Sequence, residues 1–194
     1  MKKVIIKTAI ITLASIIAFC ILLGSVFLVF MPNKVADFYQ SVGEIEKTLE
    51  YREKAFNKLE DSESLKLLLI ACVNAKNDEK LINYFTVYTQ SDNLIINKSE
   101  IVSVAGNYCV ALSKKGETEK ALKMAGEYSL PYSKTVPYRH LIAYAIENKN
   151  EPMLQTLLQE LITLRENNKN SLTQEELMLL NLDILSLVKH FEKD

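Results

Sequence analysis

A short polar turn separates two apolar patterns of helical spacing in the stretch Lys114-Lys115-Gly116-Glu117-Thr118-Glu119-Lys120-Ala121-Leu122. Apolar residues that include pairs three or four positions apart flank the turn: Val102, Ala105, Cys109 and Leu112 before it, and Ala121, Leu122, Met124 and Ala125 after it. These offsets predict two amphipathic helices that each bury one face. Because the joint is short, we expect the two helices to be antiparallel. Gly116 fits a helix end in the left-handed conformation, which glycine adopts without a Cβ clash.

Three other polar breaks divide the chain into regular steps, at residues 41–47, 75–81 and 148–154. From Gly43 to Asn77 is 34 positions, from Asn77 to Gly116 is 39, and from Gly116 to Asn150 is 34 again. We expect Asn77 and Asn150 to take the left-handed position, because asparagine is the next-best residue there. The sequence therefore predicts an all-α domain of stacked antiparallel hairpins over residues 34–194.

The longer middle step contains a polar insertion and a helix-start signal, Ser91-Asp92-Asn93 and Asn97-Lys98-Ser99-Glu100. Asn97-Lys98-Ser99 also matches the acceptor pattern for N-glycosylation. Asparagine and serine are favoured helix N-caps, and we interpret Asn97 and Ser99 as caps.

A period near 34 residues with a helix–turn–helix unit resembles the tetratricopeptide (TPR) family. The unit from Tyr108 to Tyr128 is the most similar, since Gly116, Glu119-Lys120 and Ala121 match the family's Gly-Asp-x-x-Glu-Ala turn. The resemblance covers roughly residues 34–166 and implies a TPR-like solenoid.

The other turns depart from the family pattern, and a generic helical-hairpin solenoid is the alternative interpretation. Leu81 and Leu154 stand near the position where alanine is usual, and both of those turns look one residue short. The first unit is degenerate, because its opening helix would run only from Lys34 to Ser41.

The last stretch, 172–192, is predicted to be a helix that caps the stack. Thr173 and Glu176 have the spacing of a capping box at its start. Helical-repeat stacks need at least three units and a polar cap. We expect this helix to supply that cap, so that the chain need not dimerise in order to fold.

Residues 8–31 contain no Asp, Glu, Lys, Arg or His. A helix of this length spans about 36 Å, enough to cross a bilayer core of about 30 Å. The run is longer than the apolar part of a cleaved signal peptide and lacks a small-residue exit. Cys20 lies in its middle, after Phe19, which argues against a lipoprotein signal. We therefore predict one uncleaved transmembrane anchor.

The tail 1–7 carries Lys2, Lys3 and Lys7, which outnumber the nearest basic residue after the anchor, Lys34. The positive-inside rule then places the N-terminus in the cytosol and the C-terminal domain outside. We expect a single-pass protein of the cell membrane whose partners, apart from lipid, are other proteins or peptides.

Composition and motifs argue against several other classes of protein. The formal net charge is −1, from 23 basic and 24 acidic residues, which predicts no nucleic-acid binding. The chain contains no catalytic, phosphate-binding or zinc motif, and we expect no enzyme activity, cofactor or metal site. Cys72 and Cys109 allow a disulfide, but we favour two buried free thiols.

The TPR resemblance implies that partners bind along a concave surface formed by the first helices of each unit. By the spacing of the turns, the polar and aromatic residues placed there are Asn74, Ser113, Lys114, His140, Tyr144, Glu147 and Asn148, alongside Leu67, Ala71, Gly106 and Val110. Tyr144 is equally compatible with a core position. The loop 129–137, which contains Tyr132, is a second candidate surface.

We expect a membrane-anchored scaffold or adaptor that docks other proteins. Its layout resembles single-span, TPR-bearing ancillary subunits of bacterial translocons, which implies assistance to envelope or secreted proteins. One alternative is an extracytoplasmic sensing module that binds a small peptide or a glycan. Another is a structural protein whose span assembles with other spans.

Overall fold

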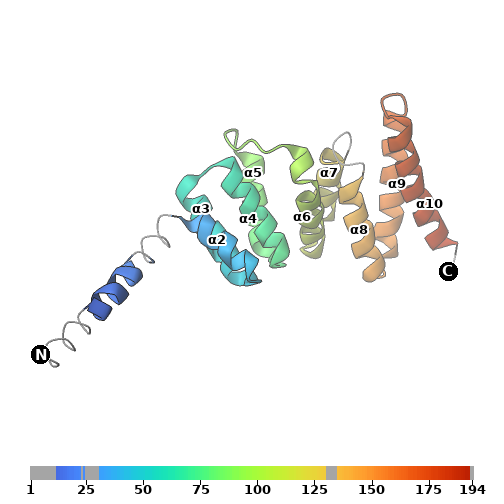
Figure 1. Cartoon of the computed structure of the whole chain (residues 1–194). Helices are drawn as coiled ribbons and strands as arrows, with labels where there is room; N and C mark the ends of the chain where they lie inside the picture. The colour runs from blue at the N-terminus through green and yellow to red at the C-terminus, as the bar shows by residue number, and fades with distance from the viewer. Residues whose placement is uncertain (1–11, 23, 25–30, 130–134, 193–194) are drawn as a thin grey trace, which may run out of the picture. The chain divides into compact units, whose positions relative to one another are not determined.

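The computed structural model describes residues 12–22, 24, 31–129 and 135–192, which form helices and contain no β-strand (Figure 1). The all-α prediction is confirmed for these residues. Two compact units divide the chain, Met1–Ala71 and Cys72–Asp194, with the boundary inside α4. The helices are α2 (Pro32–Ser41), α3 (Ile45–Leu59), α4 (Ser62–Asn74), α5 (Asp78–Gln90), a 3-10 turn η1 (Lys98–Glu100), α6 (Val102–Lys114), α7 (Thr118–Glu127), α8 (Val136–Glu147), α9 (Glu151–Asn168) and α10 (Gln174–Phe191).

Four hairpins have the same turn, which reverses the chain between α2 and α3, α4 and α5, α6 and α7, and α8 and α9. In each turn one residue has a positive φ angle, and these residues are Gly43, Lys76, Gly116 and Lys149. The first helix ends two residues before this residue and the second begins two residues after it. The following amide donates to a carbonyl five residues earlier, for example Glu117 to Leu112 at 3.0 Å. This is the Schellman arrangement of a helix C-terminus.

The prediction that Asn77 and Asn150 are left-handed is wrong. Both are helix N-caps, whose side chains accept hydrogen bonds from the amides of Lys80 at 3.0 Å and Met153 at 3.1 Å. Asparagine stabilises a helix strongly as an N-cap, whereas the preceding left-handed position tolerates lysine at a modest cost. The turns are therefore not one residue short, and the left-handed residues are 33, 40 and 33 positions apart.

With this register, equivalent positions in the hairpins are buried alike. The residues eight positions before the left-handed residue are Val35, Leu68, Tyr108 and Leu141, all buried. The residues five positions after it are Thr48, Leu81, Ala121 and Leu154, also all buried. A common turn thus directs one apolar face of each helix inward.

In the N-terminal unit, a buried arginine ties α2 to α3. Arg52 is 4% exposed and donates to the carboxylate of Asp37 at 2.7 Å, the side chain of Asn33 at 3.1 Å and that of Gln40 at 3.2 Å. A buried guanidinium needs such acceptors, because an uncompensated buried charge is strongly destabilising. Pro32 occupies the first turn of α2, where its missing amide hydrogen costs nothing.

In the C-terminal unit, an aromatic cluster joins α5, α6 and the end of α7. The rings of Phe85 and Tyr108 stack with centroids 4.2 Å apart, and Tyr128 packs edge-on against Phe85 at 5.6 Å. The hydroxyl of Tyr88 donates to the carbonyl of Ile96 at 3.2 Å, which holds the long joint before α6 against this cluster.

The start signal in the long joint acts differently from the prediction. Asn97 caps η1, and its side chain accepts from both the amide and the hydroxyl of Ser99. Ser99 does not cap α6, which begins after Ile101 without a side-chain cap. Of the two predicted caps, only Asn97 is confirmed.

The C-terminal helix has the predicted capping box, in which Thr173 and Glu176 bond reciprocally. Arg139 donates to both carboxylate oxygens of Asp183 at 3.0 Å, which fastens α10 to the start of α8. The predicted polar outer face of this cap is wrong. Its exposed side chains include Met178, Leu182 and Leu185.

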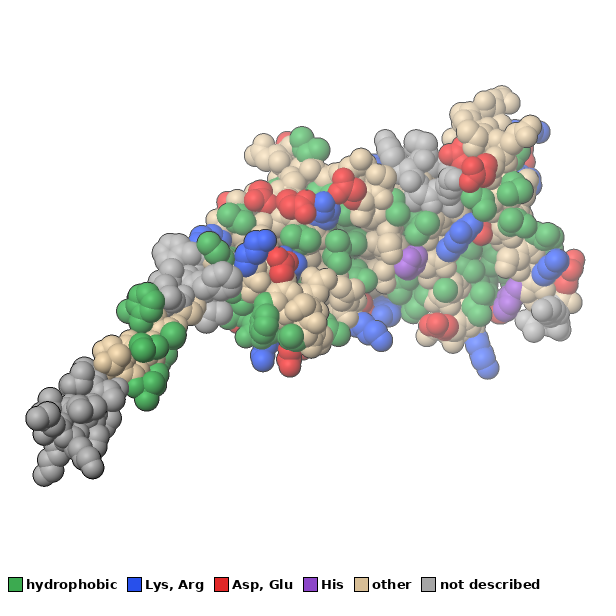
Figure 2. Space-filling view, in the orientation of Figure 1, with side chains coloured by type: hydrophobic (Ala, Val, Ile, Leu, Met, Phe, Trp, Pro, Cys, Tyr) green, Lys and Arg blue, Asp and Glu red, His purple; other side chains and the backbone are tan. Residues whose placement is uncertain are grey.

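No helix among the described residues is sufficiently long and apolar to cross a membrane. Most of the predicted anchor, 8–31, and the whole basic tail, 1–7, lie outside the described residues. Residues 12–22 are helical, and all of their side chains are exposed. Figure 2 shows that these side chains are largely hydrophobic and that none is charged.

The left-handed residues predict opposite effects of two substitutions on stability. Gly116→Ala should destabilise the fold by about 1 kcal/mol, because a Cβ atom is strained at that φ angle. Lys149→Gly should stabilise it by about 0.5 kcal/mol, because strain is relieved at an equivalent turn. Urea unfolding followed by circular dichroism measures both. If both variants changed stability with the same sign, the shared turn geometry would be contradicted.

Candidate functional site

The first helices of the last two repeated hairpins, α6 and α8, pack directly against each other. Gly106 makes this approach possible, because the ring of His140 lies across it. A Cβ atom on Gly106 would lie 2.6 Å from Cδ2 and 2.7 Å from Cγ of His140, well inside van der Waals contact. The two helices therefore present one continuous surface.

Four of the predicted site residues are exposed at the ends of the first helices, and the other three are partly buried within α6 and α8. Asn74 ends α4, Lys114 ends α6 and Glu147 ends α8, and all three are exposed. They are equivalent residues, each two positions before a left-handed residue. His140 and Tyr144 lie one helical turn apart on α8 and are half-buried.

The corrected turn register changes which residues of α6 correspond to those of α8. His140 and Tyr144 are equivalent to Asn107 and Ala111, not to Gly106 and Val110 as the sequence spacing suggested. Asn107 is a half-exposed residue that the sequence analysis missed. This equivalence follows from counting back from the left-handed residues Gly116 and Lys149.

Lys114 already has an ion-pair partner within the domain. Its Nζ lies 2.8 Å from Oδ2 of Asp78 in the first turn of α5. The two side chains are 48% and 39% exposed, so this solvent-accessible pair contributes little to stability. The pair places a positive and a negative charge side by side at the C-terminal end of α6.

Two further predicted residues differ in their hydrogen bonding. The side-chain amide of Asn148 donates to the carbonyl of Tyr144 at 2.8 Å and so closes the end of α8. The side-chain oxygen of Ser113 is buried, and no hydrogen bond to it occurs in the described part of the chain. An unpaired buried hydroxyl is unfavourable by about 1–3 kcal/mol.

Burial lowers the pKa of His140 below its ordinary value of 6.5, because the partly desolvated ring disfavours the charged form. The side chain is therefore neutral at pH 7. A neutral imidazole offers one donor and one acceptor to a bound group.

The two cysteines of the helical domain are buried free thiols, as the favoured interpretation predicted. Burial raises the pKa of Cys109 to about 12, so its reactive thiolate form is scarce at neutral pH. Among the described residues, no three His, Cys, Asp or Glu side chains converge on a possible metal position. Tyr132, in the second candidate surface, lies outside the described residues.

No protein-family model matches this chain, and comparisons with curated proteins and with solved structures likewise find no match. The function therefore has to be inferred from the residues and from their geometry.

The contact between Gly106 and His140 predicts strong coupling in a double-mutant cycle. In the native chain, Gly106→Ala should destabilise the fold by about 1–2 kcal/mol, because the new methyl group displaces the ring. In a His140→Ala background the same change should stabilise it by about 1 kcal/mol, the helix preference of alanine over glycine. Urea unfolding of the four proteins gives the coupling. Additive effects would show that the ring does not rest on Gly106.

The lowered pKa of His140 predicts a pH-dependent contribution to stability. This contribution is complete above the unfolded-state pKa of 6.5 and is lost as the pH falls below it, because the unfolded chain binds the proton more readily. His140→Gln should therefore lose less thermal stability than the native chain between about pH 7.5 and about pH 5.5. Thermal unfolding at these pH values tests this, and parallel curves for the two proteins would contradict it.

Proposed function

We propose that this chain is a single-pass membrane adaptor with a TPR-like helical domain, which binds an extended segment of another protein. The binding site that we propose is the α6–α8 surface, defined as Asn107, Val110, Lys114, His140, Tyr144 and Glu147. The proposed function is non-enzymatic, because the fold only supplies a surface to which that segment binds.

The observation that carries the proposal is the close approach of α6 and α8 at Gly106. Because the His140 ring bridges the two helices there, half-exposed side chains from both lie on one strip. The strip combines apolar Val110 and Tyr144 with the amide of Asn107 and the neutral imidazole of His140. Tyrosine is enriched at interfaces, since it adds contact area at a small entropic cost.

The charges on the strip favour a segment without a strong net charge. Lys114 and Glu147 stand at equivalent helix ends and carry opposite signs. An extended chain exposes amide groups that the Asn107 and His140 side chains are able to hydrogen bond, and its apolar side chains suit Val110 and Tyr144.

The membrane part of the proposal is supported by residues 12–22. Large apolar side chains on this helix are exposed, including Leu13, Phe19 and Leu22 at 60%, 62% and 64%. A continuous apolar surface of this kind is unfavourable in water and marks a membrane or protein contact. The lysines of the basic tail favour the orientation with the domain outside.

The TPR-like part of the proposal is supported by the repeated turn. The four hairpins share helix ends, a left-handed residue and a buried position five residues after it. Ala121 is the alanine in that position, as in the family pattern. The other three positions hold Thr48, Leu81 and Leu154 instead of alanine, which sets this chain apart from that pattern.

Site-specific photocrosslinking in intact bacterial cells tests the proposed site. A benzophenone amino acid in place of Val110 should crosslink a recurrent protein partner, because this position lies within the strip. The same probe in place of Lys123, exposed on α7, should capture none of it. Tyr144→Ala combined with His140→Ala should reduce the Val110 crosslink by roughly tenfold, the loss expected for truncating a central aromatic contact.

Membrane fractionation of the same cells serves as the control for anchoring. The chain should remain with the membranes after an alkaline wash, with or without the surface substitutions. Equal crosslinking at Val110 and Lys123 would contradict the proposed site. A chain that the wash extracts would contradict the anchor while leaving the site open to the crosslinking result.

A further inference from the structure

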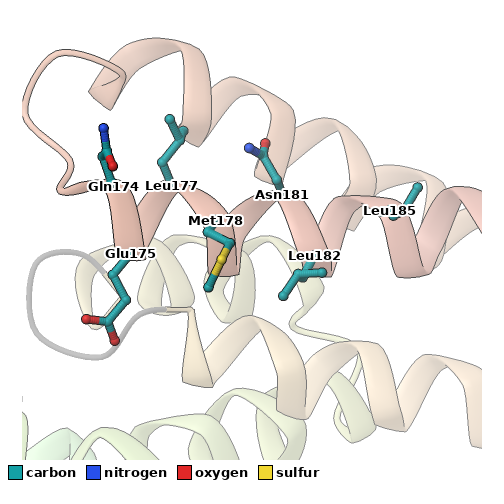
Figure 3. Close-up of a pocket in the computed structure, with 7 residues that line it drawn as sticks. All are labelled: Gln174, Glu175, Leu177, Met178, Asn181, Leu182 and Leu185. Carbon is teal, nitrogen blue, oxygen red and sulfur yellow. The ribbon is translucent and has the colours of Figure 1, made fainter.

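The outer face of α10 carries a stripe of apolar side chains. Met178, Leu182 and Leu185 are 56%, 52% and 47% exposed, and they follow one another at spacings of four and three residues. Among the described residues, the hollow on this face is lined by these three side chains together with Gln174, Glu175, Leu177 and Asn181, all of which belong to α10 (Figure 3). The opposite face of the same helix is buried through Leu180, Ile184 and Leu187. The helix is thus apolar on two sides.

Charged residues continue this stripe at both of its ends. Glu175 lies three residues before Met178, and Lys189 lies four residues after Leu185. The resulting order is acidic, three apolar and basic, at spacings of 3, 4, 3 and 4 residues. This spacing is the one by which two helices pack along a common seam.

The order of charges discriminates between the possible pairings of two such helices. In an antiparallel pair centred on Leu182, Glu175 of each copy lies opposite Lys189 of the other. In a parallel pair, like charges would meet at both ends, which is destabilising. Antiparallel helices also place the positive end of one helix dipole beside the negative end of the other.

We propose that a second copy of this chain binds here, with its α10 packed antiparallel against the first around Leu182. A two-fold axis near this residue makes the interface self-complementary. The 18 residues of α10 span only about 27 Å, so the buried area lies at the low end for stable complexes and the dimer is concentration-dependent. The inference is independent of the proposed function, because it requires neither a bound peptide nor an anchor.

Thiol crosslinking of the full chain in detergent micelles tests the geometry. The background variant Cys20→Ser removes the exposed native thiol, while Cys72 and Cys109 are buried. With a short bis-maleimide, Leu182→Cys should give a crosslinked dimer, because the two thiols face each other at the axis. Lys189→Cys is the matched control. Its two thiols would lie about 21 Å apart along the helix pair and should not crosslink.

Charge exchange tests the proposed end contacts. Glu175→Lys alone should weaken dimerisation roughly threefold to tenfold in sedimentation or light scattering, because it places like charges together. Glu175→Lys combined with Lys189→Glu should restore it, since the pairs are then opposite again. Met178→Ser with Leu182→Ser should reduce it by about tenfold or more. Circular dichroism checks that each variant is folded.

Each alternative occupant of the face gives a distinct result that would overturn the proposal. Crosslinking at both 182 and 189 would indicate a parallel pair or non-specific association. A folded chain that stays monomeric and forms no crosslink at 182 would leave this face to a different protein. A dimer insensitive to the Glu175 and Lys189 changes would place the contact elsewhere, for instance in the N-terminal segment.

Discussion

The hairpins depend on one backbone hydrogen bond, which joins the amide of Glu117 to the carbonyl of Leu112 and has counterparts in the three other turns. It requires one left-handed residue, and this residue sets where the first helix ends and the second begins. Since the helical period is fixed, fixing both ends also fixes which side chains face inward. The backbone turn therefore repeats closely although its sequence does not.

The side chains that the turns direct inward differ greatly between hairpins. Nine residues after the left-handed residue stand Arg52, Phe85 and Ala125, all buried. Arg52 is satisfied by acceptors from α2, while Phe85 stacks on Tyr108. The same backbone geometry thus accommodates a buried, ion-paired arginine, an aromatic stack or a small alanine side chain at this position.

Two of the apolar surfaces on the described chain lie on residues 12–22 and on the outer face of α10. Each is costly in water and suits a different environment. The first lacks charged residues and suits lipid, whereas the second ends in Glu175 and Lys189 and suits a second helix with the same order of charges.

The sequence by itself determined the helical class, the hairpin turns and the Thr173 capping box, because these follow from local periodicity and capping chemistry. The left-handed residues in the second and fourth turns and the equivalence of His140 with Asn107 required the structure. Local preference for asparagine is ambiguous between an N-cap and the neighbouring left-handed residue, and only the backbone hydrogen bonds decide between them. Tertiary structure likewise decided the contact of His140 with Gly106 and the exposure of Leu182. Both depend on which helices pack together, and the apolar pattern of a single helix does not specify its packing partner.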